Sequence, residues 1–203
     1  MSLTDKPLRD LLAAFASPDP TPGGGSASAV ASAIGASLLM MVAGLPKTRT
    51  GSDAERAMLA GAAAALAGLQ QQLTEAVDLD AAAYDQVVAA FKLPKGSEGE
   101  QTARKAAIQR AMRGATDVPL GVMRLSAMAL KQAEAVAAHG HRAASSDVGV
   151  AVGLIGAGFR GARLNVEINL GSLSDSAYVE AVKGELERLE KETALSGLRG
   201  APP

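Results

Sequence analysis

The chain has 203 residues, a formal net charge of −1 and no cysteine, and aromatic residues make up only 2% of it. This length is enough to bury a core, and the near-neutral charge gives no sign of a nucleic-acid or anionic-membrane partner. The lack of cysteine excludes disulfides, thiolate zinc sites and cysteine nucleophiles, and the scarcity of aromatic side chains argues against a base-stacking platform.

Helical spacing of apolar residues dominates, and we find no convincing alternating strand pattern. In chain order we predict helices over residues 5–16, 26–44, 52–91, 100–113, 119–138, 145–170 and 174–195. The third opens on a capping-box signature, Ser52-Asp-Ala-Glu55, and Pro119 suits the first turn of a new helix. We therefore predict one all-α domain over residues 1–203, an elongated helical bundle with a disordered tail at 197–203.

An uncharged stretch of about twenty residues, Ala27–Pro46, fills most of the second predicted helix. Its length would allow a membrane span, but Ala, Ser and Gly outnumber the strongly apolar residues that favour insertion. Acidic residues and prolines precede it, which argues against a signal peptide. We predict a fully buried helix in a cytoplasmic protein that has no membrane partner.

A loop with three consecutive glycines, Pro20-Thr-Pro-Gly-Gly-Gly-Ser26, precedes this helix. Such a loop lets the backbone approach a ligand or another chain closely, and the free N–H groups of the helix start suit a carboxylate, phosphate or heterocycle. The sequence is neither a Walker loop nor a dinucleotide fingerprint, because no Gly-Lys-Ser/Thr follows and no strand precedes it. The alternative is a tight turn in which Ser26 is the helix N-cap.

Asp80 is the hardest residue to explain by structure alone. Helical turns counted from Leu73 place it on the apolar face, between Ala76 and Tyr84. Burial there would raise the pKa of the Asp80 carboxyl and suit it to general acid–base catalysis. The alternative is a helix bend at 78–80 that turns the side chain to solvent.

Other polar residues are weaker candidates. Asp147 is a first-turn carboxylate that suits a helix dipole or a ligand. Asn165 and Asn169 share one helix face, where they could read a heterocycle, although helix termination also explains Asn169. Lys47 and Lys95 lie in predicted loops, where they could bind an acidic substrate tail or simply be solvated.

The two histidines, His139 and His141, bracket a glycine in a predicted turn. A pair at this spacing, without further His or Cys ligands, cannot fill a zinc site. We therefore predict no metal site.

Five segments stand out when they are taken together. They are Pro20–Ser26, Asp80-Ala-Ala-Ala-Tyr-Asp85 with Leu93-Pro-Lys95, Ala115-Thr-Asp-Val-Pro-Leu120, Ser146-Asp-Val-Gly-Val-Ala151 and Gly161-Ala-Arg-Leu-Asn-Val-Glu-Ile-Asn-Leu170. In order and spacing they resemble one family, the formimidoyltetrahydrofolate cyclodeaminases and methenyltetrahydrofolate cyclohydrolases. The resemblance covers about Leu8 to Leu189.

The resemblance implies an elongated all-helical subunit in an intertwined or closely packed homodimer, with folate bound near the glycine turn and the subunit contact. It leaves two reactions open. In a cyclodeaminase, a folate nitrogen attacks the formimidoyl carbon and ammonia leaves. In a cyclohydrolase, water attacks the methenyl carbon and the ring opens to formyltetrahydrofolate. Neither needs a metal or redox cofactor, and a free-standing chain leans slightly to the cyclohydrolase.

The resemblance also assigns roles to single residues. Asp80 would be the proton shuttle, and Asp147 would orient the pterin or assist. The remaining residues would bind substrate: Gly23, Gly24, Gly25 and Ser26 shape the pocket, Asn165 and Asn169 complete its polar wall, and Lys95 meets the acidic tail. Lys47 stays a candidate substrate-binding residue from its loop position alone.

Two segments depart from the pattern of this family. They are Gly44-Leu-Pro-Lys-Thr-Arg49, where the family commonly has Asn-Leu-Thr and a glycine-lysine cluster, and Gly140-His141, where it commonly has Gly-Asn. Both lie where polar substrate contacts are expected. The alternative reading is therefore a non-catalytic helical homodimer, or an enzyme with a changed substrate on the same fold.

Overall fold

The computed structural model describes residues 2–195, which form six α-helices and one short 3-10 helix, Arg142–Ala144, without a β-strand. The α-helices are α1 (Leu8–Ala16), α2 (Gly24–Ala43), α3 (Asp53–Phe91), α4 (Glu98–His139), α5 (Ser145–Leu170) and α6 (Ser176–Leu195). The predicted all-α, elongated bundle is confirmed. The predicted tail at 197–203 lies outside the described residues.

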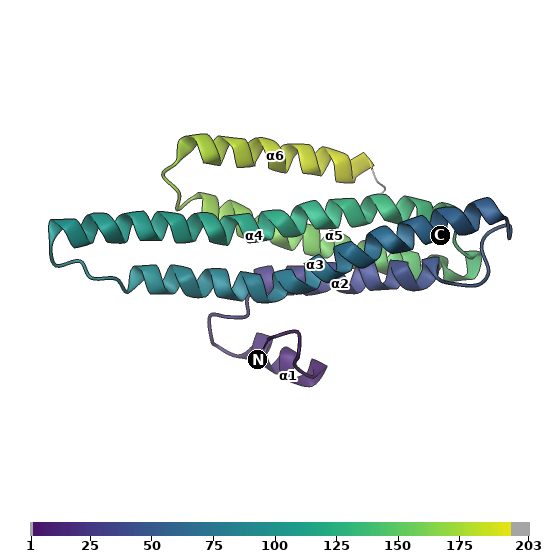
Figure 1. Ribbon diagram of the computed structural model, residues 1–203, viewed down its shortest axis with the longest axis horizontal. Helices are drawn as coiled ribbons and strands as arrows, with labels where there is room; N and C mark the ends of the chain where they lie inside the picture. Colours follow the sequence, from purple (N-terminus) through teal and green to yellow (C-terminus); the bar gives the residue numbers. More distant parts are fainter. Residues whose placement is uncertain (1, 196–203) are drawn as a thin grey trace.

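Four helices form the core of the bundle. The long helices α3 and α4 run side by side, α2 and α5 lie behind them, and α6 and α1 lie on opposite sides (Figure 1). Helix α2 packs closely on α5, because a Cβ at Gly158 would overlap Ser32 and one at Gly35 would overlap Ile155. These contacts make the two helices antiparallel, so the start of α2 lies beside the end of α5.

Pro119 does not start a helix, contrary to the prediction. Helix α4 runs unbroken through it. Proline lacks the N–H that would bond to the carbonyl four residues earlier, which here is Ala115. The side-chain amide of Asn169 on α5 donates to that carbonyl oxygen at 2.8 Å. A residue distant in sequence thus satisfies the carbonyl that proline leaves free, and α4 stays helical.

Helix α2 is not fully buried, which corrects a second prediction. It is the one helix of the described chain long and apolar enough to cross a membrane by length and composition, and 56% of that window is buried. Its outer side joins the outer side of α5. We call this surface the α2/α5 face and define it by its exposed apolar residues, which are Ala27, Ile34, Met41, Val150, Ala157, Leu164 and Ile168. Ser37 and Arg160 are also exposed on it.

Candidate functional site

The start of α2 meets the middle of α3 at Asp80. One carboxylate oxygen of Asp80, Oδ2, accepts a hydrogen bond from the Ser26 backbone N–H at 2.8 Å and another from the Ser26 hydroxyl at 3.1 Å. A Cβ on Gly25 would overlap the carboxylate, so only glycine permits this approach. The close approach that the glycine loop predicts is therefore made, within one chain, by the carboxylate of Asp80.

The cap of α2 differs from the predicted one. The N-cap is Gly23, which offers no side chain, and Ser26 lies inside the first turn. Asp80 binds a free N–H of this helix start from a neighbouring helix, which is the role a capping side chain usually plays. Gly23 itself has room for a side chain, since a Cβ there would lie 3.7 Å from its nearest neighbour.

Asp80 lies at the edge of the buried stripe of α3. Ala76 and Ala83 are buried, whereas Tyr84 is 43% exposed, so the apolar face does not extend across Tyr84 as predicted. Helix α3 has no break at 78–80, and Asp80 is half-buried against α2. The predicted solvent-facing alternative is therefore wrong.

The environment of Asp80 makes its carboxyl group easier to protonate than an exposed aspartate. Burial is the largest influence and raises the pKa of the Asp80 carboxyl, while the two Ser26 donors oppose it. The same Ser26 hydroxyl also lies 2.8 Å from the carbonyl oxygen of Val77, so its one proton is shared between that oxygen and Asp80. When Asp80 is protonated, it can donate to the Ser26 oxygen while that hydroxyl serves Val77. The site can thus hold Asp80 in either protonation state.

Asn165 stands beside the same turn. A Cβ on Gly24 would lie 3.3 Å from its side-chain nitrogen, and that nitrogen donates to the Gly161 carbonyl at 2.8 Å. The structure thus brings together Gly24, Gly25, Ser26, Asp80 and Asn165. Asn169 lies one turn further on, where its amide nitrogen is used by Ala115. Any role of these residues with substrate stays a prediction.

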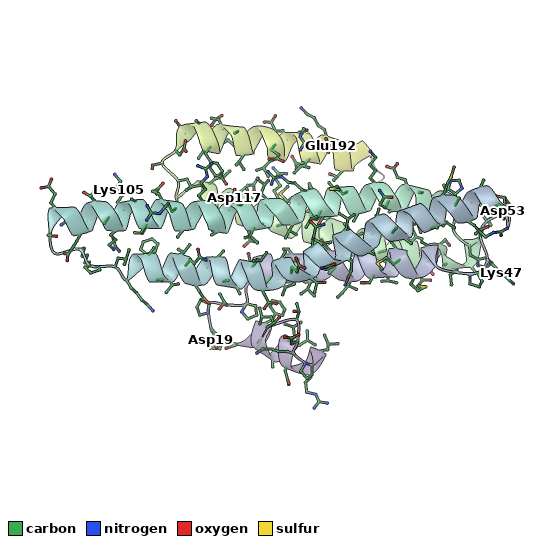
Figure 2. The ribbon with its side chains drawn as sticks, in the orientation of Figure 1. Asp19, Lys47, Asp53, Lys105, Asp117 and Glu192 are labelled. Atoms are coloured by element: carbon green, nitrogen blue, oxygen red, sulfur yellow. The ribbon has the colours of Figure 1, made fainter. Side chains whose placement is uncertain are left out.

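Asp147 lies at the other end of the bundle within one chain. It precedes Asn165 by 18 residues on the same helix, which is about five turns, or about 27 Å. Its carboxylate is half-buried and has neither a hydrogen bond nor an ion pair among residues 2–195. Lys47 follows the far end of α2 and lies at the same end of the bundle, near Asp53 (Figure 2).

Lys95 lies in the α3–α4 loop, at the opposite end of the bundle from Lys47. It lines a cavity of about 420 Å³ together with Arg104 and Lys105 of α4. Figure 2 shows Lys105 near this end. Asp80 precedes the end of α3 by 11 residues, so the Phe91 carbonyl that Arg104 contacts lies about 16 Å from it along the bundle.

Arg104 and Lys105 are candidate binding residues that the sequence reasoning missed. The signal was present, because the capping box at Ser97 and Glu100 marks where α4 begins. An antiparallel hairpin of α3 and α4 then places the first turns of α4 beside the last turns of α3.

The two segments that depart from the family pattern contact each other. Thr48 and Gly140 form an isolated antiparallel bridge, and the backbone N–H of Arg49 donates to the His139 carbonyl at 2.9 Å. The Arg49 guanidinium donates to the Ala137 carbonyl at 2.7 Å. The departures therefore form one joined structure at the Asp147 end of the bundle.

Among residues 2–195, no group of three or more His, Cys, Asp or Glu side chains is arranged to hold a metal ion. The absence of a metal or redox cofactor stays a prediction.

Comparison with known proteins gives a consistent result. The sequence profile of the formiminotransferase-cyclodeaminase family matches residues 7–188. A methenyltetrahydrofolate cyclohydrolase of Methylorubrum extorquens is 40% identical over 182 residues, which cover 90% of this chain and 88% of that protein. The formimidoyltransferase-cyclodeaminase of Sus scrofa is 32% identical over 94% of this chain, but the match spans only 35% of that longer protein.

A solved structure also matches. The crystal structure of a formiminotetrahydrofolate cyclodeaminase from Thermotoga maritima superposes with a TM-score of 0.85 at 27% identity. The match covers 96% of this chain and 93% of that one. The fold and its helix order are therefore those of a known enzyme structure.

Proposed function

The chain belongs to the formiminotransferase-cyclodeaminase family, and from this we propose that it is a folate one-carbon enzyme acting at the methenyl or formimidoyl carbon of tetrahydrofolate. The observation that carries the proposal is the half-buried Asp80 at the glycine-rich start of α2. A carboxyl group whose pKa is raised by burial can exchange protons closer to neutral pH.

The first candidate reaction is that of a methenyltetrahydrofolate cyclohydrolase. The relative with this name is the more similar of the two proteins compared by sequence, and this chain matches nearly all of it. Asp80 takes a proton from water as the water oxygen bonds to the methenyl carbon. The bond from that carbon to one of its two nitrogens then breaks, and the electron pair stays on this nitrogen. Asp80 returns a proton to it, and the hydroxyl proton is lost as the formyl carbonyl forms.

The second candidate is the cyclodeaminase reaction, which the solved structure favours because it is that of a formiminotetrahydrofolate cyclodeaminase. Here a folate nitrogen attacks the formimidoyl carbon, and the amino group leaves as ammonia. Asp80 would protonate that leaving group and accept the proton of the attacking nitrogen. Both reactions pass through a tetrahedral carbon, so the same proton shuttle serves either.

The cationic cavity supports a site for the acidic tail of the substrate. Lys95 and Lys105 have no ion pair among the described residues, and the Arg104 guanidinium is held by the Phe91 carbonyl at 2.9 Å. For its glutamate carboxylates to reach this end of the bundle, a folate whose pterin lies at Asp80 must extend about 16 Å, the rise over the 11 residues from Asp80 to the end of α3. Lys95 is therefore our candidate for binding the glutamate tail of the substrate. Lys47 lies at the opposite end of the bundle and could contact a substrate only from there.

The α2/α5 face supports a homodimer. No charged residue occurs anywhere in α2, and the exposed residues of the face are apolar apart from Ser37 and Arg160. Two helices of this length lying side by side present about 600 Å² of surface. This area is close to the roughly 800 Å² that each partner buries in a specific interface. A dimer in the cytoplasm that requires no metal or redox cofactor completes the proposal.

The experiment that tests the function follows the near-ultraviolet absorbance of the methenyl group. Loss of absorbance from methenyltetrahydrofolate above the uncatalysed rate would support the cyclohydrolase. Gain of absorbance from formimidoyltetrahydrofolate, with release of ammonia, would support the cyclodeaminase. Absence of turnover in both would contradict the proposal and favour a changed substrate or a non-catalytic dimer.

A further inference from the structure

Helix α1 has little to stabilise it within one chain. It has nine residues, and none of them is buried among residues 2–195. Figure 1 shows α1 at the edge of the molecule, apart from the four core helices. Isolated helices shorter than about 12–15 residues are only marginally stable in water, because forming the first turn costs more entropy than its hydrogen bond returns. A helix this short therefore needs a packing surface that the single chain does not provide.

One side of α1 is apolar and suited to such packing. Leu8, Leu11, Leu12 and Phe15 recur at the spacing that places them on one side of a helix, and we call this side the α1 face. Leu8 is 68% exposed and Leu12 is 59% exposed, so the α1 face is largely open to solvent.

The segment that carries α1 is fixed to α3 at both ends. Before α1, the Leu3 backbone N–H and the Thr4 hydroxyl donate to the Asp78 carboxylate at 2.6 Å and 3.1 Å. After α1, the Ser26 backbone N–H donates to Asp80 at 2.8 Å. Helix α1 begins four residues after Thr4, so chain length keeps its start within about 14 Å of that residue. The helix is thus held in place before any association, which lowers the entropy that binding would cost.

The area of the proposed homodimer interface also calls for a further element. The α2/α5 face presents about 600 Å², whereas each partner in a specific interface buries roughly 800 Å². Helix α1 is about 14 Å long and its apolar side about 10 Å wide, so the α1 face raises the total to about 750 Å². The chain passes from α1 through residues 17–23 to the start of α2, where the α2/α5 face begins at Ala27.

We propose that α1 is a dimerisation arm, whose α1 face packs on a second copy of this chain beside the α2/α5 face. The inference rests on the homodimer of the proposed function and is independent of its reaction. A two-fold axis near Ile34, in the middle of α2, pairs the start of one α2 with the end of the other. The arm then meets Met41 of the partner subunit, which is 45% exposed and has an unbranched side chain that adapts to its neighbours.

A second copy fits the α1 face better than other occupants. A lipid surface would favour an excess of basic residues along the helix, but Asp5, Lys6, Arg9 and Asp10 balance in charge. A different protein on α1 would leave the α2/α5 face without a partner. A second copy covers both apolar surfaces in one contact.

The dissociation constant of the dimer tests the proposal. Loss of one buried leucine contact corresponds to about tenfold in affinity, and the two-fold axis makes each contact occur twice. Leu12→Lys should therefore raise the dissociation constant about 100-fold in sedimentation equilibrium. The matched control is Ala13→Lys, which adds the same charge at an exposed position about 100° further round the helix, off the α1 face. It should leave the dissociation constant within about twofold of the wild-type value.

Three outcomes would overturn the proposal: a wild-type chain that is monomeric, an unchanged dissociation constant for Leu12→Lys, or equal weakening by both substitutions. Because α1 buries no residue among the described ones, circular dichroism should show the same helix content in both variants. Sedimentation needs no folate, so the test is separate from that of the reaction. A dimer that Leu12→Lys weakens, but that turns over neither folate, would contradict the proposed function alone.

Photo-cross-linking tests the contact without changing the charge of α1. The chain has no cysteine, so Leu12→Cys introduces a single thiol to which a benzophenone maleimide can be attached. Irradiation should give a dimer-sized product on a denaturing gel. The control is Met128→Cys on α4, which is 55% exposed but lies off both faces. A product from Leu12→Cys that stays monomer-sized, or equal dimer formation by the control, would show that α1 does not pack on a second copy.

Discussion

Two carboxylates on α3, Asp80 and Glu55, lie at opposite ends of α2 and have opposite environments. A single oxygen of Glu55, Oε2, accepts from the Thr48 hydroxyl at 2.6 Å, the Thr50 N–H at 2.8 Å and the Gly51 N–H at 3.2 Å. The Thr48 hydroxyl is the largest influence, the Thr50 N–H follows, and together they lower the pKa of Glu55 to about 2. Asp80 has donors from Ser26 alone, and burial raises its pKa.

The difference separates a structural carboxylate, Glu55, from the one that we propose to be reactive, Asp80. Donors from three residues fix Glu55 in its charged form, and it ties the α2–α3 loop to the start of α3. At Asp80 both donors go to Oδ2, and Oδ1 accepts no hydrogen bond within residues 2–195. A desolvated carboxyl group with one open oxygen can take and return a proton, which the proposed chemistry requires.

The largest expected effect is on activity, from Asp80→Asn. The amide oxygen can still accept from the Ser26 N–H, but the group can no longer transfer a proton, so kcat should fall roughly 10²- to 10⁴-fold. A pKa raised by folding means that the charged carboxylate costs stability above that pKa, and this cost is relieved as pH falls through it. The neutral amide should therefore leave Tm unchanged or raised at neutral pH.

The matched control is Asp78→Asn, two residues earlier on α3. Although burial opposes them, hydrogen bonds from Ser2, Leu3 and Thr4 hold the pKa of Asp78 below its usual value. Loss of the Asp78 carboxylate should lower Tm and leave kcat close to the wild-type value. An Asp80→Asn enzyme that stays active, or that unfolds at a lower temperature than the wild type, would contradict the proposed contrast between Asp80 and Asp78.

Gly25→Ala should have the next largest effect. Its Cβ would overlap the Asp80 carboxylate, so one of the two must move. We expect kcat/KM to fall about 10- to 100-fold and stability to fall by about 1–3 kcal/mol. The control is Gly68→Ala in α3, where no atom lies within 4 Å of the added Cβ. That change should raise stability by about 0.5–1 kcal/mol at unchanged activity, because alanine favours helix.

Glu55→Gln should act on stability rather than on turnover. The depressed pKa means that the contribution of Glu55 is present in full above the unfolded value of 4.5 and is lost as pH falls toward about 2. The variant should unfold at a lower temperature at pH 7 and lose less of its remaining stability across that window. Thermal unfolding between pH 7 and 2.5 measures both, with the exposed Glu187→Gln as control. A variant with lowered kcat and unchanged Tm would contradict the structural role.

The sequence predicts a structural feature well where that feature depends on contacts between residues close together in the chain. Helix periodicity and caps predicted the helices within a few residues, but α4 was wrongly divided at Pro119. The compensating donor, Asn169, is 54 residues from the carbonyl that it serves in α4. No local pattern reports such a contact.

The site shows the same limit. Periodicity predicted that Asp80 is desolvated, yet its approach to Gly25 depends on how α2 and α3 pack. The Ser52 capping box was only half right: the Ser52 hydroxyl accepts from the Glu55 N–H at 3.2 Å, but the Glu55 carboxylate turns to the preceding loop. The sequence motifs also could not show that Asp147 lies at the far end of the bundle.

Ser26→Ala has the smallest expected effect, and it tests the comparison between Asp80 and Glu55 through a single hydroxyl donor. The hydroxyl lowers the pKa of Asp80, so its removal should raise that pKa further. If the carboxylate is the active base, the acid limb of the kcat/KM profile should move to higher pH, with a loss of about two- to fivefold near neutral pH. Because the Val77 carbonyl also loses its side-chain donor, stability should fall by about 1 kcal/mol.

Thr74→Val, which removes a hydroxyl bonded to the Gln70 carbonyl at 2.8 Å on α3, is the control for this change. It should leave the pH profile in place. A profile that stays in place for Ser26→Ala as well would show that the Ser26 hydroxyl serves only Val77. The backbone N–H of Ser26 would then be the sole donor to Asp80, and the contrast with the several donors around Glu55 would become larger.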